Sequence, residues 1–202
     1  MALATKLKIE VASDVICPWC YIGKKRLEKA LALLKDIETE VRWLPFQLNP
    51  GMPKEGVPRA EYRKAKFGSL ERSRALDARV IAEGRSEGIE FAFDRIERTP
   101  NTVAAHQLIA VSSDQSKVVD ALFRAYFEEA KDIGDPAVLT DIAAQCGVKG
   151  WPDKASDVSA LEDEVRAMGI TAVPTFIFDR RSGISGAYPA ETLAAAIKEA
   201  SK

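Results

Sequence analysis

Hydrophobic and polar residues alternate between Lys6 and Ala12, which predicts a half-buried strand near the start of the chain. Helical spacing follows, because apolar residues recur every three or four positions from Leu27 to Leu34. A second alternation begins at Thr39, and the turn-forming run Asn49-Pro50-Gly51 comes after it. This stretch therefore predicts a strand–helix–strand unit.

The C-terminal part of the chain has a complementary pattern. Phe176 to Phe178 predicts a strand, the polar run ending at Gly183 predicts a turn, and Ile184 to Gly186 predicts a short return strand. Pro189 then precedes a last amphipathic helix, whose apolar face comprises Leu193, Ile197 and Ala200.

The middle of the chain has the spacing of helices. An apolar stripe runs from Val118 to Phe127, and another runs from Val158 to Met168. Between them, Asp135-Pro136 is typical of a helix start, and Gly147 is typical of a helix end.

These elements predict an α/β fold interrupted by a large all-helical insertion. The α/β domain is expected to combine residues 1–52 with residues 155–202, and the insertion is expected to cover residues 53–154. A segment of this length with its own apolar stripes is too long for a loop. We expect it to form a lid or a second layer beside the functional site.

The charge of the chain is balanced, with 29 basic and 30 acidic residues among 202. Net charge therefore gives no reason to expect nucleic acid as a partner. No apolar run approaches the roughly 20 residues that cross a bilayer, so we expect no membrane partner. The first twenty residues lack the apolar core of a signal peptide, and we therefore expect a cytoplasmic location.

Three cysteines are present, and two of them form a Cys-Pro-Trp-Cys motif from Cys17 to Cys20. In a reducing compartment such a pair is typical of catalysis or metal binding. Cys17 would lie at the start of a helix, with Pro18 in its first turn, and there the backbone amides favour a thiolate. We expect Cys17 to be the exposed attacking thiol and Cys20 to be the resolving thiol.

Zinc is the alternative chemistry for this spacing. Cys17, Cys20, Cys146 and His106 would make a Cys3His set. Cys146, however, falls on the apolar stripe of Leu139 and its neighbours, which is typical of a buried packing residue. We therefore expect no metal site.

The run from Ser13 to Gly23, SDVICPWCYIG, resembles the opening of the DsbA-like family of disulfide oxidoreductases, and specifically its FrnE-like branch. Further elements of the same branch follow in order along the chain: Pro45 to Pro50, Asn101-Thr102 with Ala105-His106, Asp132 to Asp135, Gly169 to Phe176, and Ser185 to Ala187.

The resemblance implies a thioredoxin-like fold with a helical insertion, as the hydrophobic pattern does. It also implies that the Val173–Pro174 peptide bond is cis and faces the cysteine pair, and that the backbone of Val173 pairs with an extended substrate. It implies that the helix carrying His106 faces the redox centre. The intervening Pro-Trp differs from the Pro-His of the best-known DsbA oxidants, so the direction of catalysis stays open.

Three further residues are candidates for the active site, each with a structural alternative. Asp14 is a candidate to accept a proton during exchange or to raise the pKa of the thiol by its charge, or else it is a turn residue. Trp19 would offer substrate a flat apolar contact, unless it packs against the insertion. His106 would serve as a proton shuttle, or else as a packing residue of its helix.

The leading hypothesis is thiol–disulfide exchange between the Cys17/Cys20 pair and a protein or small-thiol substrate. A glutathione-dependent transferase or isomerase of the same superfamily is the alternative, and a zinc-stabilised binding module is a third. The exchange needs no cofactor beyond the redox-active pair, with glutathione as one candidate co-substrate. We expect a monomer or a homodimer.

Overall fold

The computed structural model describes residues 6–155 and 157–202, so the first five residues of the predicted domain 1–52 lie outside the described part. The chain divides into two compact units. The α/β unit combines Met1–Phe46 with Ser159–Lys202, and the helical unit is Gln47–Val158. The predicted α/β fold with a helical insertion is confirmed.

The α/β unit is built on a four-stranded sheet with the order β2-β1-β5-β6. Its first two strands are parallel, as a strand–helix–strand unit requires, and the other pairs are antiparallel. Val11 lies opposite Trp43 on one side and Phe176 on the other. The strands are β1 (Leu7–Ser13), β2 (Thr39–Pro45), β5 (Thr175–Phe178) and β6 (Ser182–Ser185).

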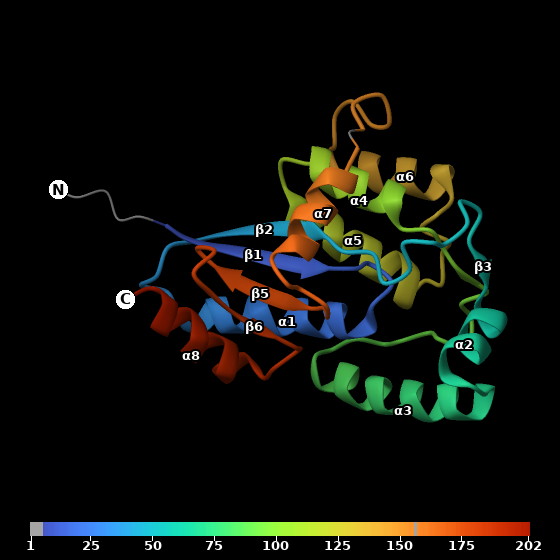
Figure 1. The fold of residues 1–202 in the computed structure, drawn as a ribbon, viewed down its shortest axis with the longest axis horizontal. Helices are drawn as coiled ribbons and strands as arrows, with labels where there is room; N and C mark the ends of the chain where they lie inside the picture. The colour runs from blue at the N-terminus through green and yellow to red at the C-terminus, as the bar shows by residue number, and fades with distance from the viewer. Residues whose placement is uncertain (1–5, 156) are drawn as a thin grey trace. The chain divides into compact units, whose positions relative to one another are not determined.

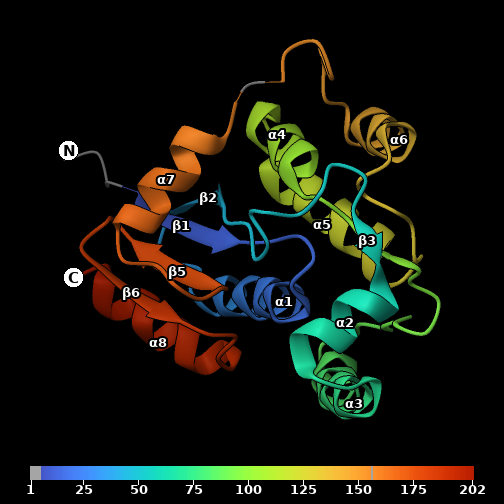
Figure 2. The same ribbon diagram turned by 45° about the vertical axis from the view of Figure 1, so that its right-hand side comes forward.

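Helices cover both faces of this sheet (Figure 1). In both views α1 and α8 lie on one face and α7 lies on the other (Figure 2). The helices are α1 (Pro18–Leu33), α7 (Ser159–Ala167) and α8 (Ala190–Ala200). The predicted last helix is thus present, and Pro189 is its N-cap residue.

The alternation from Lys6 to Ala12 predicted a half-buried first strand, but the strand is almost entirely buried. β1 is the inner strand between β2 and β5, and all of its residues except Lys8 are buried. Glu10 is only 7% exposed. Arg180 neutralises this carboxylate with two hydrogen bonds, from Nε and Nη2 at 2.7 and 2.9 Å.

Five helices and a minimal strand pair make up the described part of the helical unit. The insertion is therefore not entirely helical, because β3 pairs with β4 in an antiparallel ladder of two residues each. Its elements are β3 (Val57–Pro58), α2 (Arg59–Phe67), α3 (Leu70–Ser86), β4 (Arg98–Thr99), α4 (Val103–Val111), α5 (Gln115–Phe127) and α6 (Pro136–Cys146).

The caps of α6 follow the sequence prediction. Asp135 accepts a hydrogen bond from the backbone amide of Ala137 at 2.8 Å, and Pro136 occupies the first turn. Gly147 ends the helix in the left-handed conformation with φ of 75°.

The segment after β2 belongs to the helical unit, whereas the prediction placed residues up to 52 in the α/β domain. Phe46 still donates a backbone hydrogen bond to Ser13 at 3.1 Å. Beyond it, Asn49 accepts a hydrogen bond from the Tyr62 hydroxyl at 3.0 Å, and Met52 accepts one from the Asn101 side chain at 2.7 Å. These side-chain bonds tie residues 47–52 to the helices that follow.

A membrane span would need a long apolar helix, and none of the helices within residues 6–155 and 157–202 combines sufficient length with sufficient hydropathy.

Candidate active site

The end of β1 and the start of α1 position the two cysteines. A turn joins them, in which the Cys17 amide donates to the Asp14 carbonyl at 3.0 Å. Cys17 is the N-cap residue of α1, and Pro18 opens the helix without losing a backbone hydrogen bond. The Cys17 sulfur therefore lies at the positive end of the helix dipole, where the backbone amides of Cys20 and Trp19 also act to lower its pKa.

The two thiols are not joined in a disulfide, and their environments separate their pKa values. A hydrogen bond from the Cys20 side chain lowers the pKa of Cys17, although burial and the charge of Asp14 oppose this effect. Burial is the main cause that raises the pKa of Cys20, and the hydrogen bond to Cys17 and the charge of Cys17 raise it further. The arrangement favours a thiolate on Cys17 and a neutral thiol on Cys20.

Cys17 is less exposed than predicted. Its exposed fraction is 5%, against 1% for Cys20, so the pair is buried and Cys17 is only the more accessible of the two. One reason is the loop before β5, because the Cys17 sulfur lies 3.8 Å from the Val173 carbonyl oxygen, to which the protonated thiol donates. The peptide bond that follows, Val173–Pro174, is cis.

Gly23 lets the Pro174 ring approach α1 closely, a role that its position in the sequence did not predict. A Cβ atom at this position would lie 2.9 Å from Pro174 Cγ and 3.3 Å from the ring of Phe176. Only glycine fits this approach without a shift of the proline. The signal in the sequence was a glycine inside a helix, where it costs about 1 kcal/mol relative to alanine and usually has a packing reason.

Replacing Gly23 with alanine is expected to lower the free energy of unfolding by about 1 kcal/mol, because overpacking costs about 1–3 kcal/mol and the better helix propensity offsets up to about 1. The displaced Pro174 should also slow thiol–disulfide exchange. Urea unfolding and an exchange assay check both effects. Gly51→Ala is the matched control, since a Cβ there meets nothing within 4 Å. Equal behaviour of the two variants would contradict the close approach.

The other predicted site residues lie in different surroundings. Trp19 follows Pro18 in the first turn of α1 and is 38% exposed. Asp14 is fully buried, and its backbone carbonyl closes the turn before the helix. His106 belongs to the helical unit, where it is buried on α4. Its part in the redox chemistry stays a prediction.

Replacing Asp14 with asparagine is expected to lower the pKa of Cys17 further, because the charge of the Asp14 carboxylate raises it. Asparagine keeps the size of the side chain and the carbonyl that closes the turn. The rate of Cys17 alkylation by iodoacetamide, followed against pH in the reduced protein, should inflect at a lower pH. The exposed Asp36→Asn should leave the inflection unchanged. An inflection at higher pH in Asp14→Asn would show that this carboxylate does not raise the pKa.

Cys146 is not the buried packing residue that its apolar stripe predicted. It is the last residue of α6, it is partly exposed, and its sulfur donates to the Lys117 carbonyl at 3.8 Å. The helix ends there, so the side chain lies past the buried face formed by Leu139, Ile142 and Ala143. Within the described ranges, no three histidine, cysteine or acidic side chains are grouped in a way that would hold a metal ion.

Comparison with known proteins identifies the family. The sequence profile described as DSBA-like thioredoxin domain matches residues 8–198. The uncharacterized protein YwbO of Bacillus subtilis (strain 168) is 30% identical over 181 residues, which cover 84% of this chain and 85% of YwbO. The crystal structure of the probable DsbA oxidoreductase SCO1869 from Streptomyces coelicolor is 32% identical, with a TM-score of 0.84 over 96% of this chain and 89% of that chain.

A more distant structure has the same fold. The cytosolic disulfide reductase DsbM from Pseudomonas aeruginosa, solved with GSH, has a TM-score of 0.61 at 16% identity over 96% of this chain and 95% of that chain. Because the profile spans the sheet, the cysteine pair and the helical insertion, the chain belongs to the DsbA-like thioredoxin domain family of oxidoreductases.

Proposed function

We propose that this chain catalyses dithiol–disulfide exchange on protein or small-thiol substrates, with Cys17 as the nucleophile and Cys20 as the resolving thiol. One arrangement carries the proposal: Cys17 is the N-cap residue of α1 and the more accessible of two free thiols, and the lowered pKa of Cys17 beside the raised pKa of Cys20 agrees with it. Only the thiolate attacks a disulfide, so this difference gives the two cysteines different roles.

The reaction proceeds through a mixed disulfide. The Cys17 thiolate attacks one sulfur of the substrate disulfide, a bond forms between them, and the other substrate sulfur leaves as a thiolate. Cys20 then loses its proton and attacks the Cys17 sulfur, which releases the second substrate sulfur and closes the Cys17–Cys20 disulfide. The substrate gains two electrons, and the cysteine pair loses two. The reverse sequence oxidises a dithiol substrate.

The pKa of Cys20 is expected to fall once the mixed disulfide has formed, which is when Cys20 must lose its proton. Two of the causes that raise its pKa, a hydrogen bond to Cys17 and the charge of Cys17, depend on the Cys17 thiolate. Both disappear when Cys17 enters the mixed disulfide, and burial is then the main remaining cause. Cys20 is therefore easier to ionise after the substrate has bound covalently than before.

The substrate is proposed to lie beside the Val173–Pro174 loop and Trp19. Val173 presents its carbonyl 3.8 Å from the Cys17 sulfur, which suits pairing with an extended segment next to the reacting sulfur. The partly exposed Trp19 would add an apolar contact. Glutathione is a proposed co-substrate, supported by the GSH bound to DsbM, which shares the fold. A cytoplasmic location and the FrnE-like branch remain part of this proposal.

The testing experiment is a glutathione redox titration. The purified protein is equilibrated at varied ratios of reduced to oxidised glutathione, quenched with an alkylating reagent, and analysed by mass spectrometry intact and as peptides. Cys17 and Cys20 should change together as a two-electron couple, while Cys146 remains alkylatable throughout. The midpoint then shows whether the pair reduces or oxidises its partners.

Other outcomes of this titration would overturn the proposal. A single glutathione adduct on Cys17, with no Cys17–Cys20 disulfide at any ratio, would support glutathione-dependent transfer or isomerisation instead. A pair that never oxidises and carries stoichiometric zinc would support the metal-binding alternative.

A further inference from the structure

A cavity of about 570 Å³ lies within the helical unit. Its walls come from α2, from α3 and from the segment between α3 and β4. This volume is in the range of small-molecule sites, which is about 300–1,000 Å³. All of its lining residues lie between Arg59 and Ile96, so the cavity contains none of the cysteines. The proposed exchange reaction does not use it.

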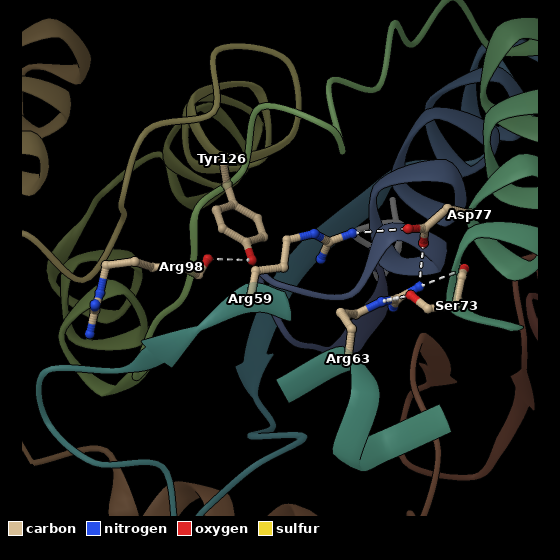
Figure 3. Close-up of polar contacts among 6 residues, drawn as sticks. All are labelled: Arg59, Arg63, Ser73, Asp77, Arg98 and Tyr126. Carbon is tan, nitrogen blue, oxygen red and sulfur yellow. Dashed lines mark hydrogen bonds and ion pairs between the residues drawn. The ribbon is translucent and has the colours of Figure 1, made fainter. Parts of the chain in front are cut away.

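One wall carries a cluster of charged side chains from α2 and α3 (Figure 3). Arg59 donates from Nη2 to one carboxylate oxygen of Asp77 at 3.2 Å, and Arg63 donates from Nη2 to the other. Arg63 also donates from Nε to the Ser73 hydroxyl at 2.7 Å and from Nη2 to the Ser73 carbonyl at 3.2 Å. Two guanidinium groups therefore share a single carboxylate.

This cluster has an excess positive charge away from bulk water. The side chains of Arg59 and Arg63 are each 12% exposed, and that of Asp77 is 16% exposed. Burial lowers the pKa of Arg63 and raises the pKa of Asp77, and the charge of Arg59 lowers the pKa of Arg63 further. Burial disfavours the charged form of both groups, whereas the repulsion between Arg59 and Arg63 reflects two positive charges that share one carboxylate. An anion in the cavity would supply further negative charge.

Arg59 has hydrogen-bond donors to spare for such an anion. A guanidinium carries five N–H groups, and within the described residues the Arg59 side chain donates to Asp77 alone. Its guanidinium carbon lies 5.1 Å from the centre of the Phe93 ring, which holds the group in place. The planar arrangement of these N–H groups matches a carboxylate.

Apart from Arg74 and Asp94, the remaining walls are apolar. Phe91 and Phe93 stack with their ring centres 4.7 Å apart, and both line the cavity together with Ile81 and Ile96. Leu70, also on the lining, is 38% exposed. A ligand with an apolar or aromatic body would bury these surfaces.

We propose that this cavity binds a small organic carboxylate with an apolar or aromatic body. The lining contains three arginines, Arg59, Arg63 and Arg74, and two aspartates, Asp77 and Asp94, so three positive minus two negative charges leave one positive charge. One unit charge matches a carboxylate better than a phosphate group, which carries about 1.5 to 2 negative charges at neutral pH. The site is a second binding site, separate from the cysteine pair in its residues and its chemistry.

The test is calorimetric titration of the full chain with 4-phenylbutyrate and, as the matched neutral probe, 4-phenylbutyramide. The acid should bind with one site per chain, and the amide should bind at least about tenfold more weakly, which is 1.4 kcal/mol. Arg59→Gln should weaken binding of the acid at least about tenfold, because a charge-assisted contact is lost. Arg63 still pairs with Asp77 in this variant. Arg79→Gln, an exposed arginine of α3 outside the cavity lining, should bind as the parent chain does.

Several results would overturn the proposal. Equal affinity for the acid and the amide would show that the guanidinium groups do not recognise the carboxylate, and absence of binding by both up to millimolar concentration would show that the cavity is not a site for this class. NMR amide chemical shifts of the parent chain, followed during titration with the acid, are a second measurement that needs no variant. Saturable shifts with the acid should centre on Ile81 and Phe91, and shifts confined to other regions would exclude this cavity.

Discussion

Replacing Cys17 with serine is expected to lower the rate of thiol–disulfide exchange by at least about a thousandfold, the scale on which loss of a catalytic nucleophile acts. Serine has no sulfur with which to form a mixed disulfide, and its hydroxyl is not ionised at neutral pH even beside the Cys20 thiol that lowers the pKa of Cys17. The measurement is the initial rate of reduction of a fluorogenic disulfide peptide, with reduced glutathione regenerating the enzyme.

The serine variants of the two cysteines should differ in the covalent adducts that accumulate. Cys20→Ser should attack substrate through Cys17 and then stop, so that a mixed disulfide accumulates and is visible in the intact mass. Cys17→Ser should form no adduct at neutral pH, because the pKa of the remaining Cys20 is raised mainly by burial. Cys146→Ser is the control and should retain full activity. An adduct that forms on Cys20 in Cys17→Ser at the parental rate would reverse the proposed roles.

Replacing Phe127 with alanine is expected to lower the free energy of unfolding by about 3–5 kcal/mol, the usual cost of removing a buried aromatic ring. Phe127 is 1% exposed. Its ring lies within 4.9 to 6.2 Å, centre to centre, of four other aromatic rings: Phe91, Phe93, Phe123 and Tyr126. Edge and stacked contacts of this kind add to the burial energy.

Urea unfolding, followed by fluorescence and circular dichroism together, measures this loss. Leu33→Ala is the control, because Leu33 is a large apolar residue that is 61% exposed and should change the stability by less than about 0.5 kcal/mol. A Phe127→Ala variant as stable as Leu33→Ala would contradict the assignment of the helical core to this aromatic cluster.

Much of the fold followed from local patterns. The alternation after Lys6, the helical spacing after Pro18 and the alternation after Thr39 predicted the elements that form β1, α1 and β2. The caps of α6 at Asp135 and Gly147 were equally predictable, because capping depends on a few neighbouring residues and on the conformations that each residue type adopts. These signals survive in the tertiary structure because packing agrees with them.

The domain boundary was less predictable. Asn49-Pro50-Gly51 marked a turn, but a turn does not show which neighbour its residues bind. The contacts of Asn49 with Tyr62 and of Met52 with Asn101 decide it. The clustered guanidiniums of Arg59 and Arg63 were likewise not singled out, since a basic helix usually presents its charges to water.

The sequence by itself determined where the proposed redox chemistry would take place: at a cysteine pair three residues apart at the start of a helix, which needs only local geometry. Tertiary structure alone decided how that chemistry is enclosed. The Val173 carbonyl, 156 positions from Cys17, limits access to the sulfur, and the ring of Pro174 dictates glycine at position 23. Glu10 is buried because Arg180, 170 positions away, pairs with it. Local periodicity reports the backbone conformation of a segment, whereas the partners that bury or neutralise a side chain come from distant parts of the chain and exist only after folding.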